Sequence, residues 1–131
     1  MKTKLILTLA VFVFVLSSCQ KDLATDWTGT YVGVSGSTFS RVVVTKVNDK
    51  TIKLELQSSV LGSYVTQATI ANGKLNSVSS LSVNEDGNVL GYSGVWHFSG
   101  AGNRDGNQLI LNGTATQTGQ SNLDYTFTGN K

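Results

Sequence analysis

The only cysteine of this 131-residue chain is the side chain whose position points most plainly to chemistry. Cys19 follows small residues and a nearly continuous apolar run, residues 5–16, which comes after the basic Lys2 and Lys4. A basic start, a short apolar run and small residues before a cleavage point are typical of a secretory signal peptide. At about 1.5 Å per helical residue the run spans about 18 Å, against about 30 Å for the hydrocarbon core, so it predicts no stable membrane span.

The four residues Leu16-Ser17-Ser18-Cys19 resemble a lipobox, the motif of bacterial lipoprotein signals. The resemblance implies cleavage before Cys19, a diacylglyceryl thioether on its sulfur and an acyl chain on its new amine. Because two acyl chains anchor a protein stably where one does not, this chemistry would hold the protein to a membrane. The alternative is a leftover thiol, which a secreted chain would expose to oxidation or cross-linking.

The three residues after the cysteine, Gln20, Lys21 and Asp22, are similar to a Bacteroidetes-type lipoprotein export signal. That resemblance implies a lipid-anchored outer-membrane protein exposed on the cell surface. An ordinary polar tether, with the protein facing the periplasm, is the alternative. We therefore expect residues 1–18 to be removed, residues 19–26 to form a lipidated N-terminus and tether, and residues 27–131 to form a single domain.

Cleavage also changes the charge balance on which partner classes depend. The whole chain has ten basic and eight acidic residues, and Lys2 and Lys4 leave with the signal, so the mature part is balanced at eight of each. No basic surface remains to predict a nucleic-acid partner. With one cysteine there is no internal disulfide, so packing must hold the core.

The residues offer little for catalysis. His97 is the only histidine and lies between Trp96 and Phe98. A hydrolytic triad needs a nucleophile, a base and an orienting acid together, and a zinc site needs several clustered ligands. We expect no enzyme, no metal and no cofactor, and we interpret His97 as a polar residue on one face of a strand.

Two loops share the pattern Asn-x-Asp-Gly-Asn, at residues 84–88 and 103–107. Asp-Gly favours the positive φ of hairpin turns, which predicts a turn at each. Calcium binding is the alternative, but calcium takes about six to eight oxygen ligands and neither loop has EF-hand spacing.

Alternating apolar and polar residues indicate an all-β domain. The clearest case is Ile52, Leu54 and Leu56, which alternate with polar side chains as in a half-buried strand. About eight strands with short connections predict an antiparallel up-and-down meander closed into a barrel, because closure removes exposed edges. A two-sheet β-sandwich is the alternative. The expected strands are 27–34, 39–47, 52–57, 64–71, 74–83, 89–98, 108–116 and 123–128.

The segments Trp27-Thr28-Gly29-Thr30-Tyr31-Val32-Gly33 and Tyr125-Thr126-Phe127-Thr128-Gly129 open and close the domain. They resemble small lipocalin-like (calycin-type) domains of bacterial lipoproteins, which implies a lipocalin-like barrel. That family usually packs a basic residue of the last strand on its tryptophan, and the last expected strand here has none.

Aromatic residues carry the remaining functional hypothesis. Tyr92, Trp96 and Phe98 share one face of an expected strand with Leu90, and we predict that all four point inward. They either fill the core or line a site for a small apolar or sugar-like ligand. A protein-interaction module, such as an enzyme inhibitor or envelope scaffold, is the alternative function. A cavity lined by these rings would favour the ligand, and a filled interior with exposed apolar residues would favour the protein partner.

Overall fold

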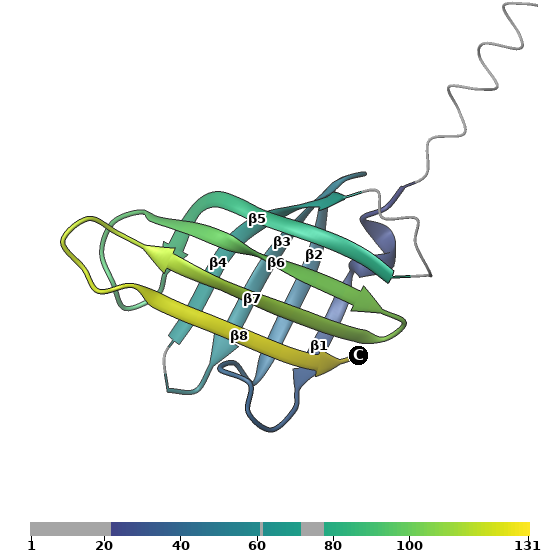
Figure 1. Cartoon of the computed structure of the whole chain (residues 1–131), viewed down its shortest axis with the longest axis horizontal. Coiled ribbons are helices and arrows are strands. Elements are labelled where there is room, and N and C mark those ends of the chain that lie inside the picture. Colours follow the sequence, from purple (N-terminus) through teal and green to yellow (C-terminus); the bar gives the residue numbers. More distant parts are fainter. Residues whose placement is uncertain (1–21, 61, 72–77) are drawn as a thin grey trace, which may run out of the picture.

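Eight antiparallel strands form a closed barrel (Figure 1). The computed structural model describes residues 22–60, 62–71 and 78–131. Each strand pairs with the next along the chain, and the last pairs with the first. The predicted all-β meander and barrel are therefore confirmed, and the sandwich alternative is wrong. A short 3-10 helix, η1 (Thr25–Trp27), precedes the strands β1 (Gly29–Gly33), β2 (Arg41–Asn48), β3 (Thr51–Ser58), β4 (Gly62–Ala71), β5 (Val78–Val89), β6 (Trp96–Asp105), β7 (Gln108–Thr116) and β8 (Leu123–Asn130).

Several expected features lie outside the described residues. They are the signal peptide at residues 1–18, the expected first residues of the mature chain (Cys19, Gln20 and Lys21), and the start of the strand expected at 74–83.

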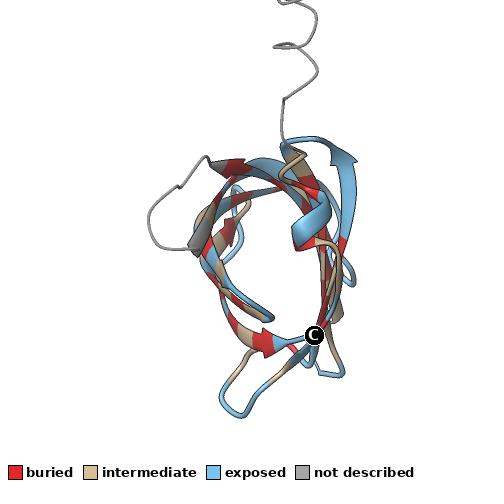
Figure 2. Ribbon diagram, turned by 90° about the vertical axis from the view of Figure 1, so that its right-hand side faces the viewer, coloured by how far each residue is buried: buried red, intermediate tan, exposed pale blue. Residues whose placement is uncertain are grey.

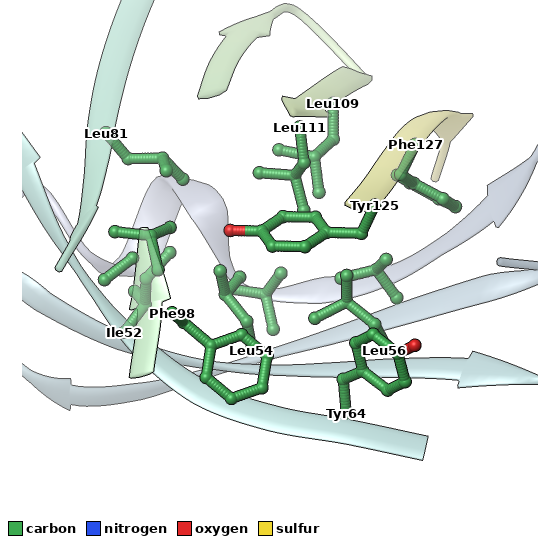
Figure 3. Packing of buried hydrophobic residues seen from close by; sticks show 14 of the residues in the cluster. Ile52, Leu54, Leu56, Tyr64, Leu81, Phe98, Leu109, Leu111, Tyr125 and Phe127 are labelled. Carbon is green, nitrogen blue, oxygen red and sulfur yellow. The ribbon is translucent and has the colours of Figure 1, made fainter. Parts of the chain in front are cut away.

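The barrel wall follows the period-two alternation of its strands. Ile52, Leu54 and Leu56 of β3 are at most 1% exposed, whereas Lys53 between them is exposed. Side chains at alternate positions of every strand point to the same face, so this register brings one apolar set into the barrel (Figures 2 and 3).

Inward-facing aromatic rings lie over glycines of the wall. The hydroxyl of Tyr125 donates to the carbonyl of Ser99 at 3.2 Å, and its ring crosses Gly113, where an added Cβ would collide with it. Phe98 covers Gly87 in the same way, since a Cβ there would lie 2.9 Å from the ring. Small barrels fill their interior by setting large side chains against small ones. These glycines therefore serve packing.

The first Asn-x-Asp-Gly-Asn segment is strand, and the prediction of a turn at residues 84–88 is wrong. Here β5 continues to Val89, and Gly87 pairs with Trp96 of β6. Gly87 is needed because an added Cβ would collide with the backbone carbonyl of Val65 and with the ring of Phe98, so its sequence signal is one of packing and not of turning. The second segment does turn: Gly106 has a φ of +57° between β6 and β7.

The two ends of the barrel carry different connections between the strands. The end that we call the closed end carries η1, the turns at residues 49–50 and 106–107, and the C-terminus. The opposite end, which we call the loop end, carries residues 34–40, 59–60, 90–95 and 117–122. In Figure 1 the C-terminus lies on the right and the loop between β7 and β8 on the far left.

Trp27 of η1 plugs the closed end and is 1% exposed. The hydroxyl of Tyr31 donates to the Trp27 carbonyl at 2.8 Å, and the guanidinium of Arg104 lies 5.7 Å from the centre of the indole ring. The ammonium of Lys131 donates to the carbonyls of Asp26 and Thr28 at 3.2 and 3.0 Å. Basic side chains from β6 and from the residue after β8 thus lie over the aromatic rings of Trp27 and Tyr31 at this end.

Candidate functional site

The predicted site residues separate into a buried pair and an exposed pair. Trp96 and Phe98 are 0% exposed and point inward as predicted. The prediction was wrong for Leu90 and Tyr92, which are 69% and 49% exposed. Because β5 runs on to Val89 and β6 begins only at Trp96, residues 90–95 form a connection instead of a strand.

The interior that these rings were expected to line is packed. Its apolar side chains are at most 3% exposed, and Tyr64, Phe98 and Tyr125 form a row of rings with centres 6.1 and 6.3 Å apart (Figure 3). A lumen large enough for water would leave its walls accessible. These side chains therefore form a core.

Exposed apolar side chains gather at the loop end. Among the described residues seven large hydrophobic side chains are exposed, and five of them lie in its four loops. These loops, residues 34–40, 59–60, 90–95 and 117–122, contain no Asp, Glu, Lys, Arg or His. Grouped exposed apolar side chains mark interaction sites more often than isolated ones do. We call the following five side chains the apolar rim: Val34, Val60, Leu90, Tyr92 and Val95.

A pocket of about 440 Å³ opens beside the apolar rim. Tyr92 stands at its edge and packs edge-on against buried Trp96, with ring centres 5.5 Å apart. Tyr64 forms its base and packs edge-on against Phe39 at 4.8 Å. Burial, and then the nearby Tyr92 hydroxyl, raise the pKa of Tyr64, so the Tyr64 phenol stays neutral. The lining residues are Val60, Gly62, Tyr64, Leu90, Gly91, Tyr92 and Leu123.

His97 lies on the outer face of β6, as predicted. Its Nδ1 is 3.1 Å from Oδ1 of Asp86, and both side chains are open to solvent. They border a shallow pocket of about 520 Å³ with Val95, Thr116, Gln117 and Thr118. Within the described part of the chain no hydroxyl is hydrogen-bonded to the imidazole, and no three metal-ligating side chains come together.

Asp22, from the expected export signal, is built into the closed end. Its carboxylate accepts hydrogen bonds from the backbone N–H groups of Ala24 and Thr25 at 3.1 and 3.2 Å and forms an ion pair with Lys46. The N–H groups of Leu23 and Ala24 both donate to the carbonyl of Asp49 at 3.0 Å, and Ala24 is 0% exposed. Residues 22–24 thus pack on the barrel. We call residues 22–24 and their contacts the N-terminal clamp.

The N-terminal clamp is expected to weaken in acid. The hydrogen bond from Lys46, followed by that from Thr25, lowers the pKa of Asp22 from 3.8 to about 2. A lowered folded-state pKa adds stability above the unfolded-state value, and that stability is lost as the pH falls from about 4 to about 2. Melts of the wild type should therefore lose Tm over this window more steeply than melts of Asp22→Asn. The control is Asp105→Asn, at an exposed carboxylate of the same end, which should follow the wild type; equal slopes for all three proteins would contradict the ion pair.

Comparison of the chain with known protein families, curated proteins and solved structures gives no match. Among the residues that the structure describes, no helix has the length and apolar character that crossing a membrane requires.

Proposed function

We propose that this protein is a lipid-anchored binding protein of the outer membrane, without enzymatic activity, that binds another protein through its loop end. The observation that carries the proposal is the apolar rim, which lies on uncharged loops at one end of a packed barrel. The barrel is compatible with a lipocalin-like domain, and it supplies the rigid support on which binding loops are usually placed.

The composition of the loops fits a protein partner. The centres of protein interfaces are depleted in charge and enriched in aromatic residues, and antibody binding loops are rich in Tyr, Ser, Gly and Asn. The loop end combines Tyr92 with uncharged Ser, Gly, Thr and Gln side chains. The partner would present an uncharged, apolar surface, and the complex would survive high salt because screening acts on charges.

A small apolar or sugar-like ligand is the second candidate. The pocket beside Tyr64 and Tyr92 supports it, because about 440 Å³ falls within the range of about 300–1,000 Å³ typical of small-molecule sites. Since the interior is packed, such a ligand would bind at the mouth of the barrel, between the two tyrosine rings.

Site-specific photo-cross-linking in the native kind of host tests the protein partner. A photo-reactive amino acid replaces Val60, which is 86% exposed on the apolar rim, or Lys53, which is exposed on the barrel wall. We expect a discrete protein adduct from position 60 that withstands high salt and disappears when Leu90→Ser is added, and no such adduct from position 53. Equal adducts from both positions, or none, would reject the protein partner.

The small-ligand candidate makes a separate prediction for the purified protein. A hydrophobic fluorescent probe should then bind the purified protein and lose affinity in Tyr92→Ala, while Val47→Ala, at an exposed position of β2, leaves binding unchanged. Probe binding without an adduct would favour the second candidate.

Anchoring through Cys19 makes a separate prediction. In the native kind of host, Cys19→Ser should move from the membrane fraction to the soluble fraction or stay unprocessed, because it lacks the sulfur that would carry the lipid. Immunoblots of the two fractions measure this. A processed Cys19→Ser protein that still sediments with membranes would show that the anchor lies elsewhere.

A further inference from the structure

The N-terminal clamp places Asp22, the first described residue, at the closed end of the barrel. Backbone hydrogen bonds join Leu23 and Ala24 to Asp49, in the turn after β2, and the ion pair of Asp22 with Lys46 adds a side-chain link. The buried Ala24 side chain holds the same segment against the core. The position at which the chain leaves the barrel is therefore set by several contacts.

Little chain separates this point from the proposed lipid. Asp22 is three residues after Cys19, and three residues span at most about 11 Å when fully extended. The barrel is longer than this reach. Strands of ten residues, such as β6, extend about 33 Å, and the usual tilt of barrel strands leaves roughly 25 Å along the barrel axis.

We propose that the N-terminal clamp orients the anchored protein, with the closed end against the bilayer and the loop end directed away from it. This inference rests on the proposed lipid anchor at Cys19. The apolar rim is the other surface that a bilayer could attract, but a linker of about 11 Å that begins at the opposite end holds it back from the membrane while the clamp is intact. Anchoring and binding are thereby assigned to opposite ends of one rigid barrel.

Fluorescence quenching on vesicles tests the orientation with the full lipidated chain. Cys19 is the only cysteine and would carry the lipid, so an introduced cysteine is the one free thiol available for a fluorophore. The two labelled variants are Lys50→Cys at the closed end and Ser93→Cys at the loop end, both at exposed positions. Each is reconstituted into phosphatidylcholine vesicles whose headgroups carry a quencher.

We expect strong quenching of the label at position 50 and little quenching at position 93. A flexible Gly-Ser insertion between Lys21 and Asp22 is the matched control, because it leaves the barrel intact and lengthens the linker, so the difference should shrink. Equal quenching at both positions without the insertion, or stronger quenching at position 93, would overturn the orientation. Failure of the protein to float with the vesicles would instead overturn the lipid anchor on which it rests.

Discussion

Replacing Trp96 with alanine is expected to lower the free energy of unfolding by about 3–5 kcal/mol, the usual cost of truncating a large core aromatic residue. Trp96 is 0% exposed where β6 begins, and Tyr92 packs edge-on against its ring. The variant loses the burial of the indole and leaves a cavity that the rigid wall of the barrel cannot fill. Urea denaturation followed by circular dichroism measures the change.

Two controls identify packing as the cause. Within the described part of the chain the indole Nε1 of Trp96 is buried without a hydrogen-bond partner, so Trp96→Phe removes no hydrogen bond and should cost far less than alanine. Val95→Ala, at a neighbouring side chain that is 62% exposed, should change stability by no more than about 0.5 kcal/mol. If Trp96→Ala were as stable as Val95→Ala, the inward register of β6 would be wrong.

The sequence predicts the barrel wall best where one strand alternates cleanly. Ile52, Leu54 and Leu56 identify β3 because one face is apolar and the other polar, and period-two burial needs only local information. The closed meander followed from the number of such strands and the short connections between them. Both predictions need only the local alternation of apolar and polar residues and the lengths of the connections.

The segment from β5 to β6 was predicted poorly, because its conformation depends on contacts with residues that are distant in the sequence. Gly87 follows an aspartate and resembles a turn residue, yet it is glycine because the backbone carbonyl of Val65 and the ring of Phe98 leave no room for a Cβ. Leu90 and Tyr92 have the spacing of a strand, but they lie in a connection that turns at Gly91 and Gly94, where φ is +94° and +87°. An exposed apolar connection has no distinct local signal and looks like a buried strand.

The candidate binding surface could be found from the sequence only in part. Tyr92 was singled out as an aromatic residue, whereas Val34 and Val60 were not, because they lie in loops far apart along the chain. In an up-and-down meander every second connection lies at the same end, so correct strand boundaries would have revealed four uncharged connections at one end. The missing information was the boundary between β5 and β6.

The contacts of the closed end were beyond local reasoning for a similar reason. The guanidinium of Arg104 lies over the indole ring of Trp27, and Asp22 forms an ion pair with Lys46, which also pairs with Asp49. Nothing in the short segment around Asp22 distinguishes a residue of a tether from one that contacts the barrel, because its ion-pair partner Lys46 comes from β2.

Replacing Trp27 with alanine is expected to cost about 3–5 kcal/mol of unfolding free energy, as for other buried aromatic residues. Trp27 is 1% exposed, and its removal takes away the surface on which the guanidinium of Arg104 rests. The guanidinium of Arg104 would keep its hydrogen bond to the Gly106 carbonyl, at 2.9 Å, but would lose its contact with the indole ring. Urea denaturation of the mature protein measures the cost.

Trp27→Phe is the matched control, since it keeps a ring beneath Arg104 and should recover a large part of the stability. In conditions where Trp27→Ala remains folded, the cross-link from position 60 should persist, because the plug and the apolar rim lie at opposite ends of the barrel. An alanine variant with wild-type stability would show that η1 rests on the barrel without closing it. Loss of the cross-link from a folded Trp27→Ala protein would show that the binding surface depends on the closed end, and the proposed division of the barrel into two independent ends would be wrong.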